Sequence, residues 1–385
     1  MRIAIAFDCF FPLSTGGGER LYRLLAESFA RHGHEVTYLT RQQWTGPAPS
    51  VPGVRVRAVS GRTGLYDEHG NRRLLPALRF AAGLVRYLAR HRGSHDVVLV
   101  SALPVLNVFA VRLALAGSRT LVCADFLEVW RREQWLEYSG PVVGRVAATL
   151  QRWAARVSPL VSCHSRLHAE RLVADGTPNA PLVSPGLIHG AVLGPANEAA
   201  AEPPTVVYVG RHIPDKQVDA IPAAVAWART QIPTLRAVVL GDGGQRRAVQ
   251  AEVDRLGLTE DVTLPGFVEQ EELDRHLAAA ACLVNPSRRE GYGLVVVEAA
   301  AHGTPVVLVD APDNAAVELV EDGVNGVVAT SLAPEVLGAA LVRVVLAGPT
   351  MRSTTRAWYE RAVRERTVEV TAERLLAAFA ESRRR

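Results

Sequence analysis

Short apolar runs alternate with amphipathic, helix-like stretches along almost the whole chain, and this rhythm constrains the fold most strongly. Neighbouring parallel strands need a long crossover between them, and a helix usually supplies it. The strands expected in the first half are residues 2–7, 36–39, 54–59, 97–100, 121–124 and 160–163; those expected in the second half are residues 206–209, 237–240, 262–264, 281–284, 306–309 and 326–328. The sequence therefore predicts an α/β protein with two doubly wound parallel sheets.

The rhythm is interrupted once, and this interruption predicts a domain boundary. Residues 194–204, GPANEAAAEPP, are small and proline-rich, as an interdomain linker is. A chain of 385 residues also exceeds the size of one ordinary core. We predict a first domain of residues 1–195 and a second of residues 203–356. A final amphipathic helix, residues 357–385, has no strand left to partner and should return to the first domain.

Composition narrows the class of protein. Hydrophobic residues make up 48% of the chain and charged residues 21%, as in a soluble enzyme, and the net charge of +4 does not favour nucleic acid. The four cysteines lie in or beside apolar runs without zinc spacing, so we expect buried free thiols in a reducing compartment. No apolar run reaches the roughly 18 residues that cross a membrane. We expect a cytoplasmic protein.

The stretch of residues 284–305, VNPSRREGYGLVVVEAAAHGTP, is the strongest candidate site. It leaves an expected strand and presents Glu290 and Glu298 on either side of a glycine-rich segment. A helix that starts near Gly293 would point its free N–H groups and positive dipole end into the loop, which suits a phosphate. Carboxylates on both sides of a phosphate suit the hydroxyls of a nucleotide sugar. The paired carboxylates of a glycosidase are the alternative.

A second glycine-rich loop, residues 16–18, follows the first expected strand and precedes a helix. This is the layout of a phosphate-binding βαβ unit, although the glycines could simply make a tight turn. Ligands of such sheets bind at the carboxyl ends of the strands, so we expect both loops to face one cleft. Lys216 is the only lysine of a chain rich in arginine, which suggests a function, although chance survival is the alternative.

Motifs in both halves resemble the retaining family-4 glycosyltransferases of the GT-B fold. They are Gly210-Arg211 followed by Lys216, LGDG at residues 240–243, LPGFV at 264–268, the pair Glu290 and Glu298 with AAAHGTPVV after it, GGGER at 16–20, and Trp358-Tyr359. The resemblance covers nearly the whole chain. It implies the GT-B architecture of two Rossmann-like domains facing a cleft.

The resemblance also implies a role for each matching residue. Arg211 and Lys216 would hold the diphosphate and offset the charge of the leaving nucleotide, and Glu290 would bind hydroxyls of the donor sugar. These three residues are the catalytic candidates, and Glu298 would bind the ribose hydroxyls. The other donor-binding residues that the resemblance implies are Gly16, Gly17, Gly210, Phe267, Val268, Gly291, Tyr292, Gly293 and Leu294.

The implied reaction is transfer with retention from a nucleotide-diphosphate sugar to a hydroxyl of a small-molecule or envelope acceptor. UDP is the nucleotide expected from its frequency in the family, as a co-substrate and not a cofactor. No loop carries a DxD pair for Mg²⁺, so we expect no metal. The richness in arginine and alanine suits a GC-rich bacterial genome, and a natural-product pathway as well as envelope synthesis.

The first half departs from the family where many relatives carry a histidine. Residues 123–130 read CADFLEVW there. Asp125 and Glu128 follow an expected strand, and we predict that they line the acceptor pocket. The alternative is that Asp125 caps the start of a helix.

Two other functions remain open. A monotopic enzyme with a lipid acceptor would use residues 72–92 as a basic, amphipathic interfacial helix. A crossover helix packed on the sheet explains the same pattern, and we favour it over membrane association. A non-catalytic sugar-nucleotide-binding relative should have lost Arg211, Lys216 or Glu290, and all three are present.

Overall fold

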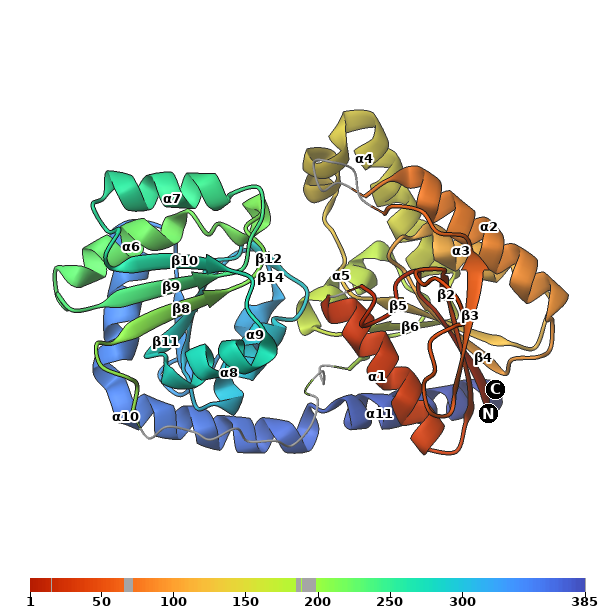
Figure 1. The fold of residues 1–385 in the computed structure, drawn as a ribbon. Helices are drawn as coiled ribbons and strands as arrows, with labels where there is room; N and C mark the ends of the chain where they lie inside the picture. The colour runs from red at the N-terminus through yellow and green to blue at the C-terminus, as the bar shows by residue number, and fades with distance from the viewer. Residues whose placement is uncertain (15, 66–71, 185–187, 189–198, 385) are drawn as a thin grey trace. The chain divides into compact units, whose positions relative to one another are not determined.

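The computed structural model describes residues 1–14, 16–65, 72–184, 188 and 199–384, which form two compact units (Figure 1). The first unit contains residues 1–189 and 366–385, and the second contains residues 190–365. Each unit is built on its own parallel sheet, so the two-sheet α/β class predicted from the sequence is confirmed. Of the linker predicted at residues 194–204, residues 194–198 lie outside the described residues.

The first unit is organised around a seven-stranded parallel sheet with the order β3-β2-β1-β4-β5-β6-β7. Its strands are β1 (Arg2–Ala6), β2 (Glu35–Arg41), β3 (Val54–Ser60), β4 (Val97–Ser101), β5 (Leu121–Phe126), β6 (Leu160–Cys163) and β7 (Leu182–Val183). β1 lies between β2 and β4, and its residues Ile3, Ala4 and Ile5 are completely buried, as expected for a strand covered on both faces. The strand order reverses between β1 and β4, which is where sheets of this kind bind ligands.

The helices of this unit in the described part of the chain are α1 (Gly17–Arg31), α2 (Leu74–Arg90), α3 (Leu106–Ala114), α4 (Arg132–Val157), α5 (Arg166–Asp175) and α11 (Val368–Arg384). α1 buries a stripe that includes Leu21, Leu25 and Phe29, as its sequence predicts. α4 begins earlier than the expected residue 143. Gly140, with a φ of +76°, bends it into two halves. α3 was not expected, because its apolar sequence shows little helical alternation.

The second unit contains a six-stranded parallel sheet with the order β10-β9-β8-β11-β13-β15. Its strands are β8 (Thr205–Val209), β9 (Arg236–Leu240), β10 (Val262–Gly266), β11 (Cys282–Asn285), β13 (Val306–Val309) and β15 (Gly326–Ala329). A separate two-stranded sheet pairs β12 (Arg289–Glu290) with β14 (Asp313–Asn314). The order of the large sheet reverses between β8 and β11, so these two strand ends mark its switch point.

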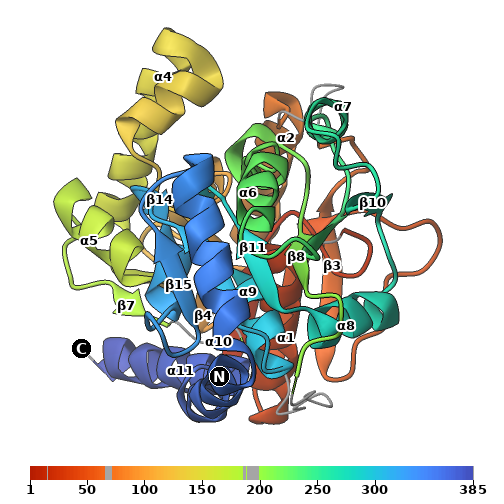
Figure 2. The same ribbon diagram turned by 90° about the vertical axis from the view of Figure 1, so that its left-hand side faces the viewer.

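The helices of the second unit are α6 (Ala220–Arg229), α7 (Arg246–Arg255), α8 (Gln270–Ala279), α9 (Leu294–Ala301) and α10 (Pro334–Glu365), with short 3₁₀ helices at η1 (Pro214–Lys216) and η2 (Ala315–Leu319). α10 packs against α6 and the β15 edge of the sheet (Figure 2). An 18-residue window of α10 is apolar enough by composition to cross a membrane. Leu337, Leu341 and Val344 of α10 are nevertheless buried in the core of the unit, which explains its apolar character.

The single final helix predicted for residues 357–385 is divided in two. Residues 357–365 continue α10, where Trp358 and Tyr359 are buried, and α11 forms after a break at residues 366–367. α11 packs on α1 in the first unit, with the rings of Phe29 and Phe379 6.2 Å apart. The return of the C-terminal helix to the first domain is therefore confirmed, but it involves only α11.

Candidate functional site

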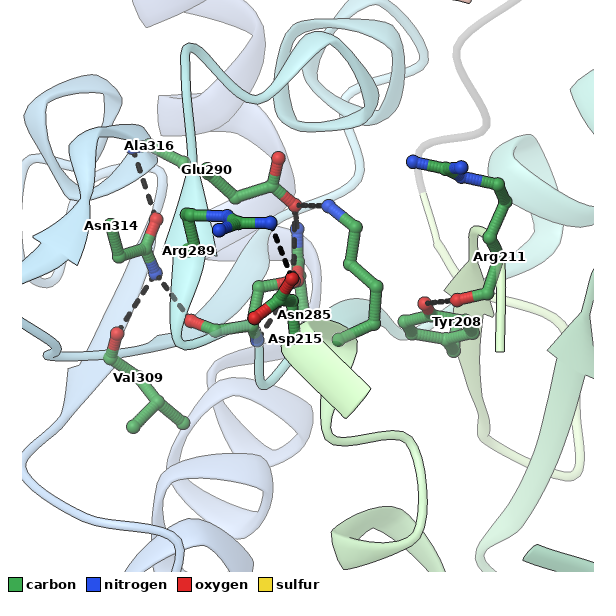
Figure 3. A network of polar contacts seen from close by, with 11 residues as sticks. Tyr208, Arg211, Asp215, Asn285, Arg289, Glu290, Val309, Asn314 and Ala316 are labelled. Atoms are coloured by element: carbon green, nitrogen blue, oxygen red, sulfur yellow. Dashed lines mark hydrogen bonds and ion pairs between the residues drawn. The ribbon is translucent and has the colours of Figure 1, made fainter. Parts of the chain in front are cut away.

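Two loops meet at the switch point of the second sheet. One leaves β8 and contains η1; the other leaves β11 and leads into β12 (Figure 3). The carboxylate of Asp215 accepts hydrogen bonds from Nε of Arg288 at 2.9 Å and from Nη2 of Arg289 at 2.5 Å. The backbone N–H of Arg288 also donates to the carbonyl oxygen of Asp215 at 3.0 Å. Asp215, which sequence analysis did not single out, therefore fixes Lys216 beside Glu290.

The carboxylate of Glu290 is the meeting point of this site (Figure 3). Its Oε1 atom accepts from Nζ of Lys216, from Nδ2 of Asn285 at 3.1 Å and from Oγ of Ser287 at 3.0 Å. Among the described residues, no donor contacts the second oxygen, Oε2. The side chains of Lys216 and Glu290 are only 20% and 14% exposed, so water screens this ion pair weakly. Glu290 is thus held by one oxygen, and the other is available to a ligand.

The loop that carries Glu290 is held in place by two buried asparagines. Oδ1 of Asn285 accepts from Oγ of Ser287 at 2.5 Å and from its backbone N–H at 3.2 Å. In β14, Asn314 pairs with Glu290 in the small sheet, and its Nδ2 donates to the carbonyls of Ser287 at 3.1 Å and Val309 at 3.0 Å. The side-chain amides of the two asparagines thus satisfy polar groups of the loop, and the loop holds the Glu290 carboxylate in a fixed position.

α9 starts immediately after Gly293, as the sequence predicts. Gly293 has a φ of +96°, and a Cβ on it would lie 2.6 Å from Cβ of Ala316, so only glycine fits there. Among the described residues, no side chain caps the N-terminus of the helix, and the N–H of Val296 already donates to the carbonyl of Gly293 at 3.0 Å. The N–H groups of Leu294 and Val295 therefore remain available to an anion. Glu298 is half-buried one turn further along, and Gly291 and the buried Tyr292 connect Glu290 to the helix.

The ends of β8, β9 and β10 approach each other through glycine backbones. A Cβ on Gly210 would lie 2.6 Å from the hydroxyl of Tyr208, and one on Gly241 would lie 1.9 Å from the carbonyl oxygen of Gly210. The N–H of Gly241 donates to the carbonyl of Gly266 at 2.7 Å. The glycines therefore let three strand ends line one edge, beside the loop of Lys216.

Two residues at this edge escaped the sequence analysis. His212 is completely buried; burial first, and then the charge of Arg246, lower the pKa of its imidazole. Neither of its ring nitrogens has a hydrogen-bond partner among the described residues. Arg246 donates from Nη2 to the carbonyl of Leu264, while its buried Nη1 has no such partner in the same part of the chain. In the sequence, the signal for His212 was its position directly after Gly210-Arg211, and the signal for Arg246 was its position shortly after LGDG.

The remaining predicted residues of the second unit lie at the same edge but are not all in contact. Phe267 follows Gly266 and is 75% exposed, and Val268 is half-buried beside it. Arg211 is exposed, and its carbonyl accepts a hydrogen bond from the hydroxyl of Tyr208 at 3.1 Å (Figure 3). The structure thus joins Lys216 to Glu290 directly and leaves the Arg211 side chain at the surface.

In the first unit, the glycine loop precedes α1 as predicted. Gly16 occupies the position before the helix, and Gly17 is its first residue. The carboxylate of Glu19, in the first turn, lies so close to Gly16 that a Cβ there would be 2.4 Å from its Oε2. A Cβ on Gly18 would lie 2.7 Å from Cδ1 of Leu127, so this glycine allows close packing against the segment after β5.

Asp125 is not placed as the sequence suggested. It lies inside β5, only 1% exposed, and caps no helix. Its Oδ2 accepts from the hydroxyl of Tyr22 at 2.6 Å and contacts Nε2 of His164 at 3.0 Å, and its Oδ1 accepts from Oγ of Ser162 at 2.5 Å. Both carboxylate oxygens of Asp125 bond to buried neighbours, so Asp125 belongs to the core of the unit and does not line an open pocket. Oε2 of Glu128 accepts from Nε1 of Trp130 at 2.7 Å, and its acceptor role stays a prediction.

Burial would by itself raise the pKa of Asp125, but the facing His164 and the three hydrogen bonds lower it overall. Burial would likewise lower the pKa of His164, and the carboxylate of Asp125 more than offsets this. The two groups thus form a buried ion pair, tied through Tyr22 to α1.

Both halves of the chain match glycosyltransferase family models. A family model described as "Glycosyl transferases group 1" matches residues 195–362, and one described as "Glycosyl transferase 4-like domain" matches residues 16–186. The D-inositol 3-phosphate glycosyltransferase of Segniliparus rotundus is 31% identical, over 94% of this chain and 84% of its own length.

Solved structures share the fold. Sucrose-phosphate synthase from Thermosynechococcus elongatus superposes with a TM-score of 0.79 at 19% identity, over 99% of this chain and 98% of that one. The Anabaena protein Alr3699/HepE, solved in complex with UDP and glucose, has a TM-score of 0.70 at 18% identity, over 99% of this chain and 100% of that one.

Proposed function

Because the chain belongs to the family-4 glycosyltransferases of the GT-B fold, we propose that it transfers a sugar, with retention, from a UDP-sugar to a hydroxyl acceptor. The observation that carries the proposal is the Glu290 carboxylate, which Lys216 holds by one oxygen beside the uncapped N-terminus of α9. A carboxylate next to an anion site suits a sugar joined to a phosphate.

In this proposal the diphosphate lies against the N–H groups that follow Gly293 and is neutralised by Lys216 and Arg211. The leaving nucleotide gains negative charge as the glycosidic bond breaks, so fixed positive charge stabilises the transition state more than the ground state. The exposed Arg211 side chain then has to fold toward the phosphates.

The hydroxyls of the donor are bound at its two ends. Oε2 of Glu290 accepts from hydroxyls of the sugar, and Glu298, one turn into α9, accepts from the ribose. The base of the nucleotide lies against the segment of Phe267 and Val268, and Arg246 and His212 lie at the same edge of the sheet. Support for UDP comes from the similar Anabaena protein, which was solved with UDP and glucose.

We propose a transfer on one face of the sugar. The bond from the anomeric carbon to the diphosphate breaks, the acceptor oxygen forms its bond on the same face, and its proton passes to the departing phosphate oxygen. No metal is required in this scheme, because Lys216, Arg211 and the start of α9 offset the phosphate charge. The acceptor is proposed to be a small molecule or an envelope component, in the cytoplasm of a bacterium.

Nucleotide release from a panel of UDP-, GDP-, ADP- and TDP-sugars tests the proposal. The wild type should turn over a UDP-sugar at the same rate with and without EDTA, and the ¹H spectrum of the product should show the donor's anomeric configuration. Glu290→Gln and Lys216→Ala should each lower turnover by about 100-fold or more. The matched controls Glu269→Gln and Arg247→Ala change exposed residues of the same unit and should have no effect. A near wild-type rate in either site variant would show that the assignment is wrong.

A further inference from the structure

The second half of α4, residues 141–157, carries an apolar stripe that faces solvent. Five apolar side chains recur every three or four residues and therefore lie along one face of the helix: Val142, Val146, Leu150, Trp153 and Val157. Val142 is 71% exposed and Trp153 is 59% exposed. A surface helix normally buries such a stripe.

α4 packs on its own unit through the opposite face, which is small and polar. Its buried residues there are Gly144, Gln151, Ala154 and Ala155. A Cβ on Gly144 would lie 2.4 Å from the carbonyl oxygen of Trp135, so the two halves of α4 pack closely at this glycine. The amide of Gln151 bonds the backbone N–H and carbonyl of Trp130 at 3.1 and 2.9 Å. The orientation of the helix is therefore fixed with the apolar stripe outward.

The start of α2 also exposes apolar side chains. The backbone N–H of Arg72 donates to the hydroxyl of Tyr138 at 3.1 Å, which brings the two helices together. Leu74 and Leu75 beside this contact are 66% and 55% exposed, and Leu78 is 47% exposed. The rest of α2 buries apolar side chains, as a crossover helix does. We call the outward side of residues 141–157 and these three leucines the α4 face. Exposed apolar side chains gathered along one helix face mark an interaction site.

Positive charge predominates beside the α4 face, where Asp175 pairs with Arg152 (Nε to Oδ1, 3.4 Å) and its carbonyl accepts from Nε of Arg156 at 2.8 Å. Arg145, Arg152 and Arg156 form an exposed row beside the apolar stripe, and residues 138–169 and 69–95 contain no aspartate or glutamate. The first unit as a whole has 28 arginines against 16 acidic residues, a formal charge of +12. The second unit has 15 basic and 23 acidic residues, a charge of −8. The small net charge of the chain hides this asymmetry.

We propose that the α4 face binds the surface of an anionic lipid bilayer. The valines and leucines enter the region below the headgroups, Trp153 lies at the boundary, and the arginine row contacts lipid phosphates. A second copy of the chain fits less well, because a symmetric contact would bring identical arginine rows together. A protein partner would need an acidic surface around an apolar centre, and a bilayer supplies both over any area. The proposal does not depend on the proposed donor chemistry.

Vesicle flotation of the full chain tests the proposal, with phosphatidylcholine vesicles that contain or lack phosphatidylglycerol. The wild type should float with the anionic vesicles, at least about tenfold more strongly than with the neutral ones, and high salt should weaken this binding. Val142→Glu/Val146→Glu and Arg145→Glu/Arg152→Glu should each lower binding about tenfold or more. Leu346→Glu changes a residue of the second unit that is 73% exposed, and it should bind like the wild type.

Circular dichroism and the melting temperature show whether each variant is folded. All the substituted side chains are exposed, so we expect native values. The proposal is overturned if the folded wild type does not bind anionic vesicles, or if the α4 variants bind these vesicles as well as Leu346→Glu does. It is also overturned if light scattering shows a dimer that Val142→Glu/Val146→Glu dissociates while vesicle binding is unchanged.

Discussion

Replacement of Asp125 by asparagine should destabilise the first unit in a way that depends on pH. The substitution keeps the shape of the side chain but removes the charge that faces His164, in a site where both residues are at most 2% exposed. Breaking a buried ion pair by changing one partner typically costs about 3–5 kcal/mol. For a unit of this size, that loss should lower the melting temperature by roughly 6 to 20 °C.

The sign of the pH dependence follows from the two pKa shifts. The pKa of His164 is raised from its ordinary 6.5, so its contribution to stability is complete below pH 6.5 and is lost as the pH rises through the raised value. The pKa of Asp125 is lowered from 3.8, so its contribution is complete above pH 3.8 and is lost only in stronger acid. The stability difference between wild type and Asp125→Asn should therefore be largest between about pH 4 and 6.5 and should shrink toward pH 9.

Differential scanning fluorimetry of both proteins from pH 5 to 9 measures this difference. His164→Gln serves as a second variant, since it removes the titrating ring and should flatten the same pH profile. A difference between wild type and Asp125→Asn that is constant, or that grows with pH, would refute the buried ion pair. A loss below about 1 kcal/mol would mean that the pair is replaceable by neutral hydrogen bonds.

Two further substitutions probe the second unit. Gly293→Ala should cost about 1–2 kcal/mol for its positive φ and more for the contact with Ala316; it should displace the start of α9 and weaken UDP-sugar binding by calorimetry about tenfold. Gly244→Ala, where an added Cβ meets open space, is the control, and equal binding by the two variants would contradict this. Arg352 is 3% exposed and donates to the carbonyls of Ala280 at 2.7 Å and Ala278 at 2.8 Å. Arg352→Met should cost about 2–4 kcal/mol, visible as a lower melting temperature, and an unchanged melting temperature would exclude that role.

The alternation of apolar and amphipathic stretches was sufficient to predict both sheets, because each buried strand is a short apolar run with a helix after it. The alternation did not predict elements whose position depends on which other parts of the chain they pack against. α3 is apolar on most sides, and the break between α10 and α11 at residues 366–367 follows from which unit buries each segment. Trp358 and Phe379 belong to one continuous helical pattern, yet they are buried in different units.

The candidate site was predictable in its charged residues and less so in their supports. Lys216, Glu290 and Gly293 follow from motif spacing, and the structure places the first two in contact. Asp215, Asn314 and Arg246 act through contacts between segments far apart in sequence, which no local pattern encodes. Asp125 shows the opposite error. An acidic residue at the end of a strand suggested an open pocket, but its partners on α1 and β6 enclose it.

The central claim is that a nucleotide-diphosphate sugar binds where Lys216, Glu290 and the start of α9 meet. Isothermal titration of UDP into the wild type, Lys216→Ala and Arg247→Ala measures it most directly, because it needs no acceptor. The account predicts that Lys216→Ala weakens UDP binding about tenfold or more, since the lysine forms charge-assisted bonds to phosphate, while Arg247→Ala binds like the wild type. Equal affinity of Lys216→Ala and the wild type for UDP would contradict the account.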